Sequence, residues 1–114
     1  MNDAAFGKVV LALTPWARLK GLLGLRSFEG VLVLAPCADV HTFAMRMKID
    51  VAFIDENGLV VRADRDVGPW RRLKAPGAIA VVERQADSHA PWLSEGAHVG
   101  MGIQPMGQDV GEAI

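Results

Sequence analysis

Cys37, Asp39 and His41 are the residues of this chain whose types and spacing could support chemistry. In an extended strand, side chains two residues apart lie on the same face, so all three could converge on one point. A cysteine beside a histidine can act as a nucleophile with its general base, as in small hydrolases and transferases. The same side chains could begin a metal site, but no second Cys/His cluster completes it at standard spacing. We therefore expect no metal and no other cofactor.

A structural role is the favoured interpretation of these residues. Cys37 is the only cysteine and follows Pro36, as expected for a small apolar residue at the end of a strand. His41 alternates with Phe43 and Met45, which indicates a partly buried histidine and not a catalytic one. A small hydrolase or transferase that uses Cys37 with His41 is thus the alternative hypothesis.

Two carboxylates, Asp50 and Glu83, interrupt apolar segments that read as strands. A buried carboxylate must be paired or hydrogen-bonded, and Arg18 could pair with either of them. If they serve no ion pair, they would line a pocket for a small ligand. The leading hypothesis is a non-enzymatic module that binds a small ligand or a protein partner. Its predicted ligand-binding residues are Arg18, His41, Met45, Asp50 and Glu83.

Composition excludes several classes of protein. The 114 residues carry 12 basic and 13 acidic side chains, a net charge of -1, without the one-sided basic surface of a nucleic-acid binder. The basic loop W-R-R-L-K (70–74) is too short to change that prediction, so we expect no nucleic-acid partner. No segment approaches the roughly 20 apolar residues of a membrane span. The first residues lack the basic start and apolar run of an export signal, which predicts a cytoplasmic protein.

Short apolar segments separated by turn residues predict a β-rich fold. We expect strands at 8–13, 30–35, 39–44, 49–55, 58–64, 78–84 and 98–103, with a tight turn at Asn57-Gly58. Thr14-Pro15 begins a helix predicted over 15–23 that ends before Gly24, and Ser88 would begin another over 88–95. Residues 66–77 are expected to form an exposed loop. The predicted architecture is a small, mostly antiparallel β-barrel of six to eight strands with one or two short helices.

The domain is expected to cover residues 1–103, followed by a loose tail over 104–114. Apolar side chains alternate from 41 to 53, which as one strand would span about 40 Å. A domain of this size has a radius of gyration of only about 13 Å, so the strand must bend or break. The charged residues at 46–48 are the expected place.

Several segments resemble domain-of-unknown-function family 192, a group of small bacterial and archaeal proteins. They are A-R-L-K-G-L-L-G (17–24), H-T-F-A-M-R-M-K-I-D-V-A-F-I-D-E-N-G-L-V-V (41–61), A-V-V-E (80–83) and E-G-A-H-V (95–99). The resemblance covers roughly residues 8 to 103 and is most specific from Met45 to Val60. It implies a single β-rich, barrel-like domain with one or two short helices. It implies no reaction, cofactor or catalytic residue, and many relatives look exported.

Overall fold

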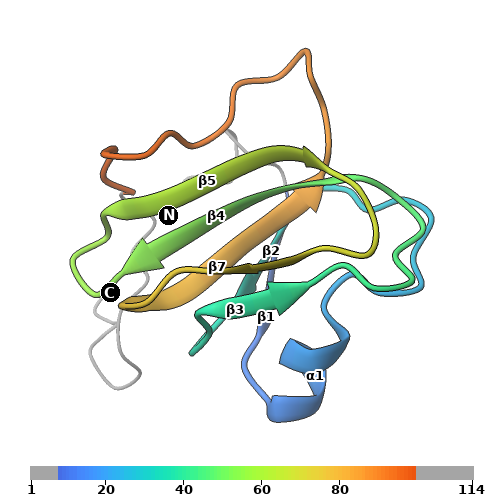
Figure 1. Cartoon of the computed structure of the whole chain (residues 1–114), viewed down its shortest axis with the longest axis horizontal. Helices are drawn as coiled ribbons and strands as arrows, with labels where there is room; N and C mark the ends of the chain where they lie inside the picture. The colour runs from blue at the N-terminus through green and yellow to red at the C-terminus, as the bar shows by residue number, and fades with distance from the viewer. Residues whose placement is uncertain (1–7, 100–114) are drawn as a thin grey trace.

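The computed structural model describes residues 8–99 and contains seven strands and one helix within them. Their order along the chain is shown in Figure 1. The elements are β1 (Val9–Ala12), α1 (Pro15–Lys20), β2 (Val31–Leu34), β3 (Asp39–His41), β4 (Ile49–Asp55), β5 (Val60–Val67), β6 (Arg72–Lys74) and β7 (Ala78–Gln85). The predicted β-rich class is therefore confirmed.

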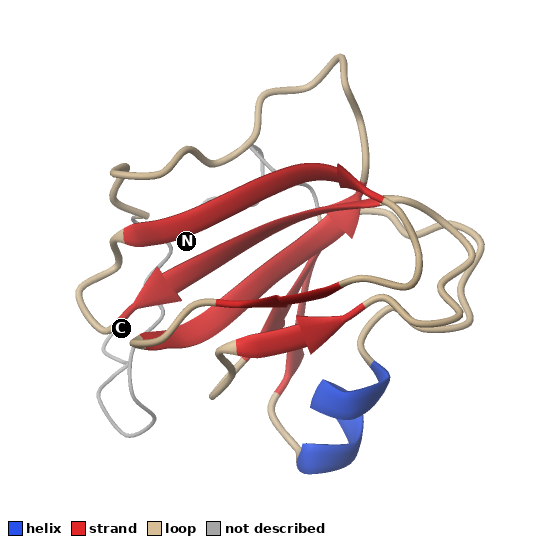
Figure 2. Cartoon of the chain, viewed as in Figure 1, coloured by secondary structure: helices blue, strands red, loops and turns tan. Residues whose placement is uncertain are grey.

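The strands form two sheets, which Figure 2 shows in red. Five of them make one sheet in the order β1-β2-β7-β4-β5, and β3 pairs with β6 in a second, two-stranded sheet. The pairings are antiparallel except that of β1 with β2, which is parallel. The expected closure into a barrel does not occur in the described part of the chain, because β1 and β5 end the large sheet without pairing with each other.

The central strands of the large sheet, β2, β4 and β7, are largely buried on both faces. One face packs against α1 and the β3–β6 sheet through side chains that include Leu22, Val40 and Leu73. The other face packs under the segment after β7, which contributes Trp92, Leu93 and Val99. Because β4 is buried on both of its faces, its sequence is a nearly continuous apolar run and does not alternate between apolar and polar residues.

The first helix begins as expected and ends early. The side chain of Thr14 accepts a hydrogen bond from the amide of Ala17 at 3.1 Å, and Pro15 is the first helical residue. The helix ends at Lys20 and not near Gly24, because Gly21 adopts φ +49° and ψ -129°, which a residue with a side chain rarely adopts. No helix in the described residues is both long enough and apolar enough to cross a lipid bilayer.

The predicted helix over 88–95 is wrong. Ser88 does not cap it, because the carboxylate of Asp87 accepts from the amide of His89 at 3.0 Å and closes a local turn instead. The carbonyls of Asp87 and Ala90 then accept from the Arg65 guanidinium at 2.7 and 2.8 Å. An arginine side chain of the sheet thus donates hydrogen bonds to backbone carbonyls that a helix would have used for its own hydrogen bonds.

The Asn57-Gly58 hairpin between β4 and β5 is confirmed. One carboxylate oxygen of Asp55 accepts from the amides of Asn57 and Leu59, and the amide of Gly58 donates to the carbonyl of Asp55. Other boundaries differ from expectation. The strand expected over 39–44 ends at His41, and the segment 66–77 contains the end of β5 and all of β6. Of the strand expected over 98–103, residues 100–103 lie outside the described residues, and His98 forms a single bridge with Leu59.

Candidate functional site

A cavity of about 80 Å³ lies where the end of α1 meets β2, β3 and β7. Its polar lining consists of Arg18, Lys20, Asp39, His41 and Glu83. Its apolar lining comes from Leu22, Leu23, Leu34, Val40 and Met45. The structure therefore brings together four of the five predicted ligand-binding residues, and only Asp50 lies elsewhere.

Glu83 is the buried polar group of this cavity. It occupies β7, between Leu32 of β2 and Val51 of β4, and only 4% of its surface is exposed. One of its carboxylate oxygens lies 3.5 Å from the position that a Cβ on Gly21 would take. Within residues 8–99, the carboxyl group makes no hydrogen bond and no ion pair. Burial alone raises the pKa of Glu83 from 4.5 to about 7.

An unpaired carboxyl group at this depth opposes folding once it is ionised. Desolvation favours the neutral acid, so the group carries its proton through part of the neutral pH range. Proteins usually avoid this arrangement, since buried polar groups are paired or hydrogen-bonded in most structures. Neighbouring side chains on the same sheet face, such as Val81, are apolar and equally buried. Glu83 is thus the residue of the cavity that stability does not explain.

Arg18 and Lys20 bring positive charge to the cavity from α1. The predicted pairing of Arg18 with a buried carboxylate does not occur, since its guanidinium donates to the carbonyl of Leu13 at 2.6 Å. Neither cation has a carboxylate within ion-pairing distance among the described residues. Sequence reasoning missed Lys20 and Gly21. Their position directly at the end of a short helix is the signal that could have identified them.

The charge of Asp39 is already balanced. Its carboxylate accepts two hydrogen bonds from the Arg72 guanidinium, at 3.1 and 2.5 Å, in a two-pronged pair. Hydrogen bonding to Arg72 holds the pKa of Asp39 below its ordinary value.

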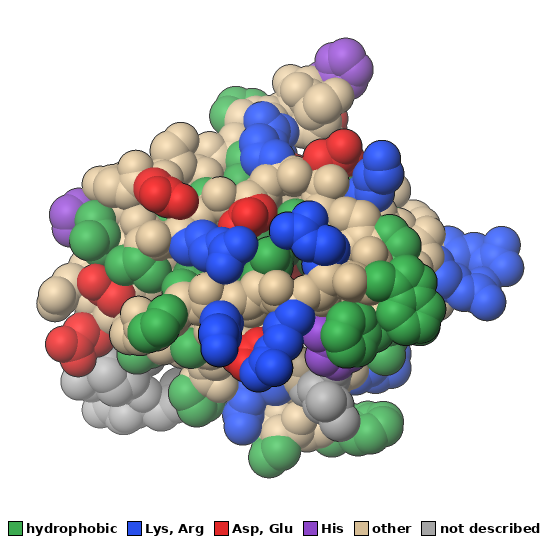
Figure 3. Space-filling model, viewed as in Figure 1, with side chains coloured by type: hydrophobic (Ala, Val, Ile, Leu, Met, Phe, Trp, Pro, Cys, Tyr) green, Lys and Arg blue, Asp and Glu red, His purple; other side chains and the backbone are tan. Residues whose placement is uncertain are grey.

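Lysine and arginine side chains gather over β5 and β6 with acidic side chains among them (Figure 3). Arg62 pairs there with Asp64 at 2.7 Å.

His41 and Met45 enter the cavity from the end of β3 and the loop after it. The Nδ1 atom of His41 accepts from the amide of Phe43 at 3.3 Å, and the two rings lie 4.9 Å apart. Met45 is buried and forms part of the apolar wall. The loop is fixed by the buried hydroxyl of Thr42, which donates to the carbonyl of Gly68 at 2.7 Å and accepts from the amide of Arg71.

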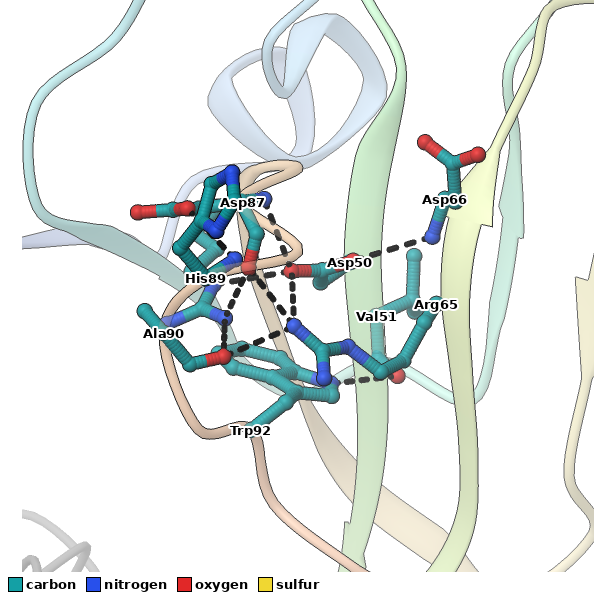
Figure 4. A network of polar contacts seen from close by, with 9 residues as sticks. Asp50, Val51, Arg65, Asp66, Asp87, His89, Ala90 and Trp92 are labelled. Atoms are coloured by element: carbon teal, nitrogen blue, oxygen red, sulfur yellow. Dashed lines mark hydrogen bonds and ion pairs between the residues drawn. The ribbon is translucent and has the colours of Figure 1, made fainter.

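Asp50 belongs to a separate network, shown in Figure 4. Adjacent residues of a strand point to opposite faces, so Asp50 lies on the face opposite that of Val51 and its neighbour Glu83. Only 1% of Asp50 is exposed, and its carboxylate accepts from Arg84 Nε and from the amide of Asp66, both at 2.9 Å. The expected hydrogen bonding of this buried carboxylate is therefore confirmed, and its role is to join β4 to β5 and β7.

Cys37 lacks the surroundings of an activated nucleophile. Its thiol donates to the carbonyl of Asp39 at 3.4 Å, and partial burial raises its pKa above the ordinary value of 9.0. Within the described residues, Cys37 and His41 make no hydrogen bond to each other. No group of three His, Cys, Asp or Glu side chains in residues 8–99 is placed to hold a metal ion.

Alkylation of Cys37 should be slow at neutral pH. A raised pKa leaves less thiolate, and the thiolate is the nucleophile. We expect iodoacetamide to label the folded protein several-fold more slowly than the urea-unfolded chain, followed by mass spectrometry across a pH series. Rapid labelling of the folded protein near neutral pH would instead favour the enzyme that uses Cys37 with His41.

Comparison with known proteins places the chain in a family. The model of DUF192, described as "Uncharacterized ACR, COG1430", matches residues 2–100. No curated protein matches the chain. A crystal structure of a protein of unknown function from Novosphingobium aromaticivorans DSM 12444 is similar, with 22% identity and a TM-score of 0.62. The match covers 68% of this chain and 62% of that one.

A second similar structure is that of a "putative transcription regulator" from Sinorhizobium meliloti 1021, with 18% identity and a TM-score of 0.61. It covers 68% of this chain and 67% of that one. At these identities the two likenesses show a shared fold and nothing about activity. The family match extends over nearly the whole sequence, and the chain therefore belongs to the DUF192 family.

Proposed function

We propose that this protein binds a small polar molecule in the cavity at Glu83 and does not transform it. The observation that carries the proposal is a carboxyl group, 4% exposed, that lines a cavity and has no partner in residues 8–99. A ligand that donates hydrogen bonds to this group would remove the cost of its burial. Sites that serve a ligand often carry such a cost in the free protein.

The lining of the cavity agrees with this proposal. A few polar groups among apolar walls are typical of small-molecule sites, since apolar contacts exclude water and polar groups fix orientation. Leu34 and Met45 supply apolar walls, and Glu83, Arg18 and His41 supply the polar groups. A volume of about 80 Å³ limits the enclosed part of the ligand to a few heavy atoms. The raised pKa of the Cys37 thiol argues against a covalent step beside the cavity.

A screen of small polar fragments tests the proposal directly. We expect some amine, amide, carboxylic acid or amino acid at millimolar concentration to shift the backbone NMR signals of Gly21, Leu22 and Glu83. Glu83→Leu should abolish the response, because it removes the only buried carboxyl group of the cavity while keeping the position apolar. Glu56→Leu, an exposed position in the hairpin turn, is the matched control and should respond like the wild type.

The proposal fails if no fragment shifts these signals. It also fails if the responding fragments shift them equally in Glu83→Leu, because binding would then not involve the buried carboxyl group. Melting temperatures of both variants, measured beforehand, ensure that folded proteins are compared.

A further inference from the structure

The charged groups of the cavity are separated into two ends. Glu83 is the buried end, with 4% of its surface exposed, whereas Lys20 is exposed and Arg18 is half-buried on α1. The two cations lack a carboxylate partner in the described residues, and Asp39 does not neutralise them because Arg72 holds it. A ligand in this cavity therefore meets a buried acidic group and, at more exposed positions of the lining, two cationic groups.

Ligands with a single charge fit only one of these ends. A simple carboxylate that reached Glu83 would meet a second negative charge once Glu83 is ionised, and like charges at short distance repel strongly. A simple amine would suit Glu83 and would have to pass Arg18 and Lys20, which repel it. A molecule with an ammonium group and a carboxylate group contacts both ends favourably.

We infer that the ligand is a small zwitterion, with its ammonium group on Glu83 and its carboxylate on Arg18 and Lys20. This inference rests on the proposed function and names the class of ligand for the same cavity. The walls formed by Leu34, Val40 and Met45 suit a short aliphatic linker between the two groups. The limited volume, about 80 Å³, favours molecules of the size of simple amino acids over larger ones.

The proposed orientation of the ligand predicts a pH dependence of binding. Burial raises the pKa of the free Glu83 carboxyl group to about 7. An ammonium group bound beside it would favour the ionised form and lower that pKa. Binding should therefore release protons near neutral pH, and the apparent affinity should rise as the pH rises through this range.

The test compares zwitterions with their single-charge fragments. Glycine, β-alanine and γ-aminobutyrate differ only in linker length, and ethylamine, propylamine, acetate and propionate each carry one of the two charges. Affinities would be measured from NMR shifts of Gly21 and Glu83 near neutral pH. At least one zwitterion should bind about tenfold or more tightly than the amine and the carboxylate of similar length, since each end adds a charge-assisted contact.

Variants at the two ends should separate the contributions. Lys20→Gln and Arg18→Gln should weaken the zwitterion and leave ethylamine unaffected or tighter, whereas Glu83→Gln should weaken the zwitterion and spare propionate. Lys20 is exposed, so its variant tests the cationic end even if Arg18→Gln folds poorly. A carboxylate or an amine that binds as tightly as the zwitterions would overturn the inference while leaving a ligand site at Glu83. No binding by any member of the panel also overturns it, and the proposed function then rests on the wider fragment screen alone.

Discussion

Glu83→Gln is expected to stabilise the protein by about 3 kcal/mol at pH 8 and to change stability little below pH 4.5. Burial raises the pKa of Glu83 from 4.5 to about 7, so the folded state holds a proton that the unfolded chain releases. Between these values the wild type loses stability as the pH rises, and the loss reaches about 3 kcal/mol above the folded pKa. Glutamine keeps the shape and cannot ionise. Urea unfolding of both proteins at several pH values measures the difference.

Glu56→Gln is the matched control for this experiment, because it makes the same substitution at an exposed position in the hairpin turn. A Glu83→Gln variant that is less stable than the wild type at pH 8 would contradict the expectation. That result would mean that the ionised carboxylate has partners that stabilise the folded protein. A stabilised variant that no longer responds to ligand would show directly that this residue costs stability in the free protein.

Asp50→Ala should destabilise the protein by about 3–5 kcal/mol, a large part of the roughly 5–15 kcal/mol available to a domain. The substitution would leave the Arg84 guanidinium, 11% exposed, without its carboxylate partner. It would also remove the acceptor of the Asp66 amide, which fastens β5 to β4. The carbonyl of Ala90 and the ring of Trp92 stay beside Arg84 and offset only part of that loss. The free energy of urea unfolding near pH 7 provides the measurement.

Two further variants define the origin of this effect. Asp50→Asn keeps most of the shape and removes the charge, so its loss should lie between the wild type and Asp50→Ala. Asp39→Ala breaks a two-pronged arginine pair on the surface, and it should cost far less because water already screens that pair. Equal losses for Asp39→Ala and Asp50→Ala would contradict the role of burial.

The sequence identifies the two buried carboxylates and cannot say which of them is paired. Asp50 and Glu83 both interrupt apolar strands in the same manner. Their difference depends on the register of β4 against β7, which sets Asp50 beside Arg84 and sets Glu83 beside Val51. Strands separated this far along the chain can pair in several registers, and a shift by one residue would exchange the two faces. Only the folded structure therefore distinguishes the paired carboxylate from the one that has no partner in residues 8–99.

Local signals in the sequence predict local structure well. Asn57-Gly58 specifies the hairpin because glycine accepts positive φ, and Thr14-Pro15 specifies the start of α1 through its cap. Two of the failures involve contacts between distant segments. The short strand β6 forms within the expected loop because β3 pairs with it, and residues 88–95 are held by Arg65 and Arg84 of the sheet. Sequence pattern contains no direct sign of these partners.

The titration of the Glu83 side-chain carboxyl carbon, followed by ¹³C NMR in the free protein, tests the central claim most directly. A buried carboxyl group without a partner should titrate with a midpoint near 7, well above its ordinary value of 4.5. A midpoint at or below 4.5 for Glu83 would mean that the carboxylate is hydrated or paired in the free protein. The cavity would then lack the unpartnered group on which the proposed ligand site depends.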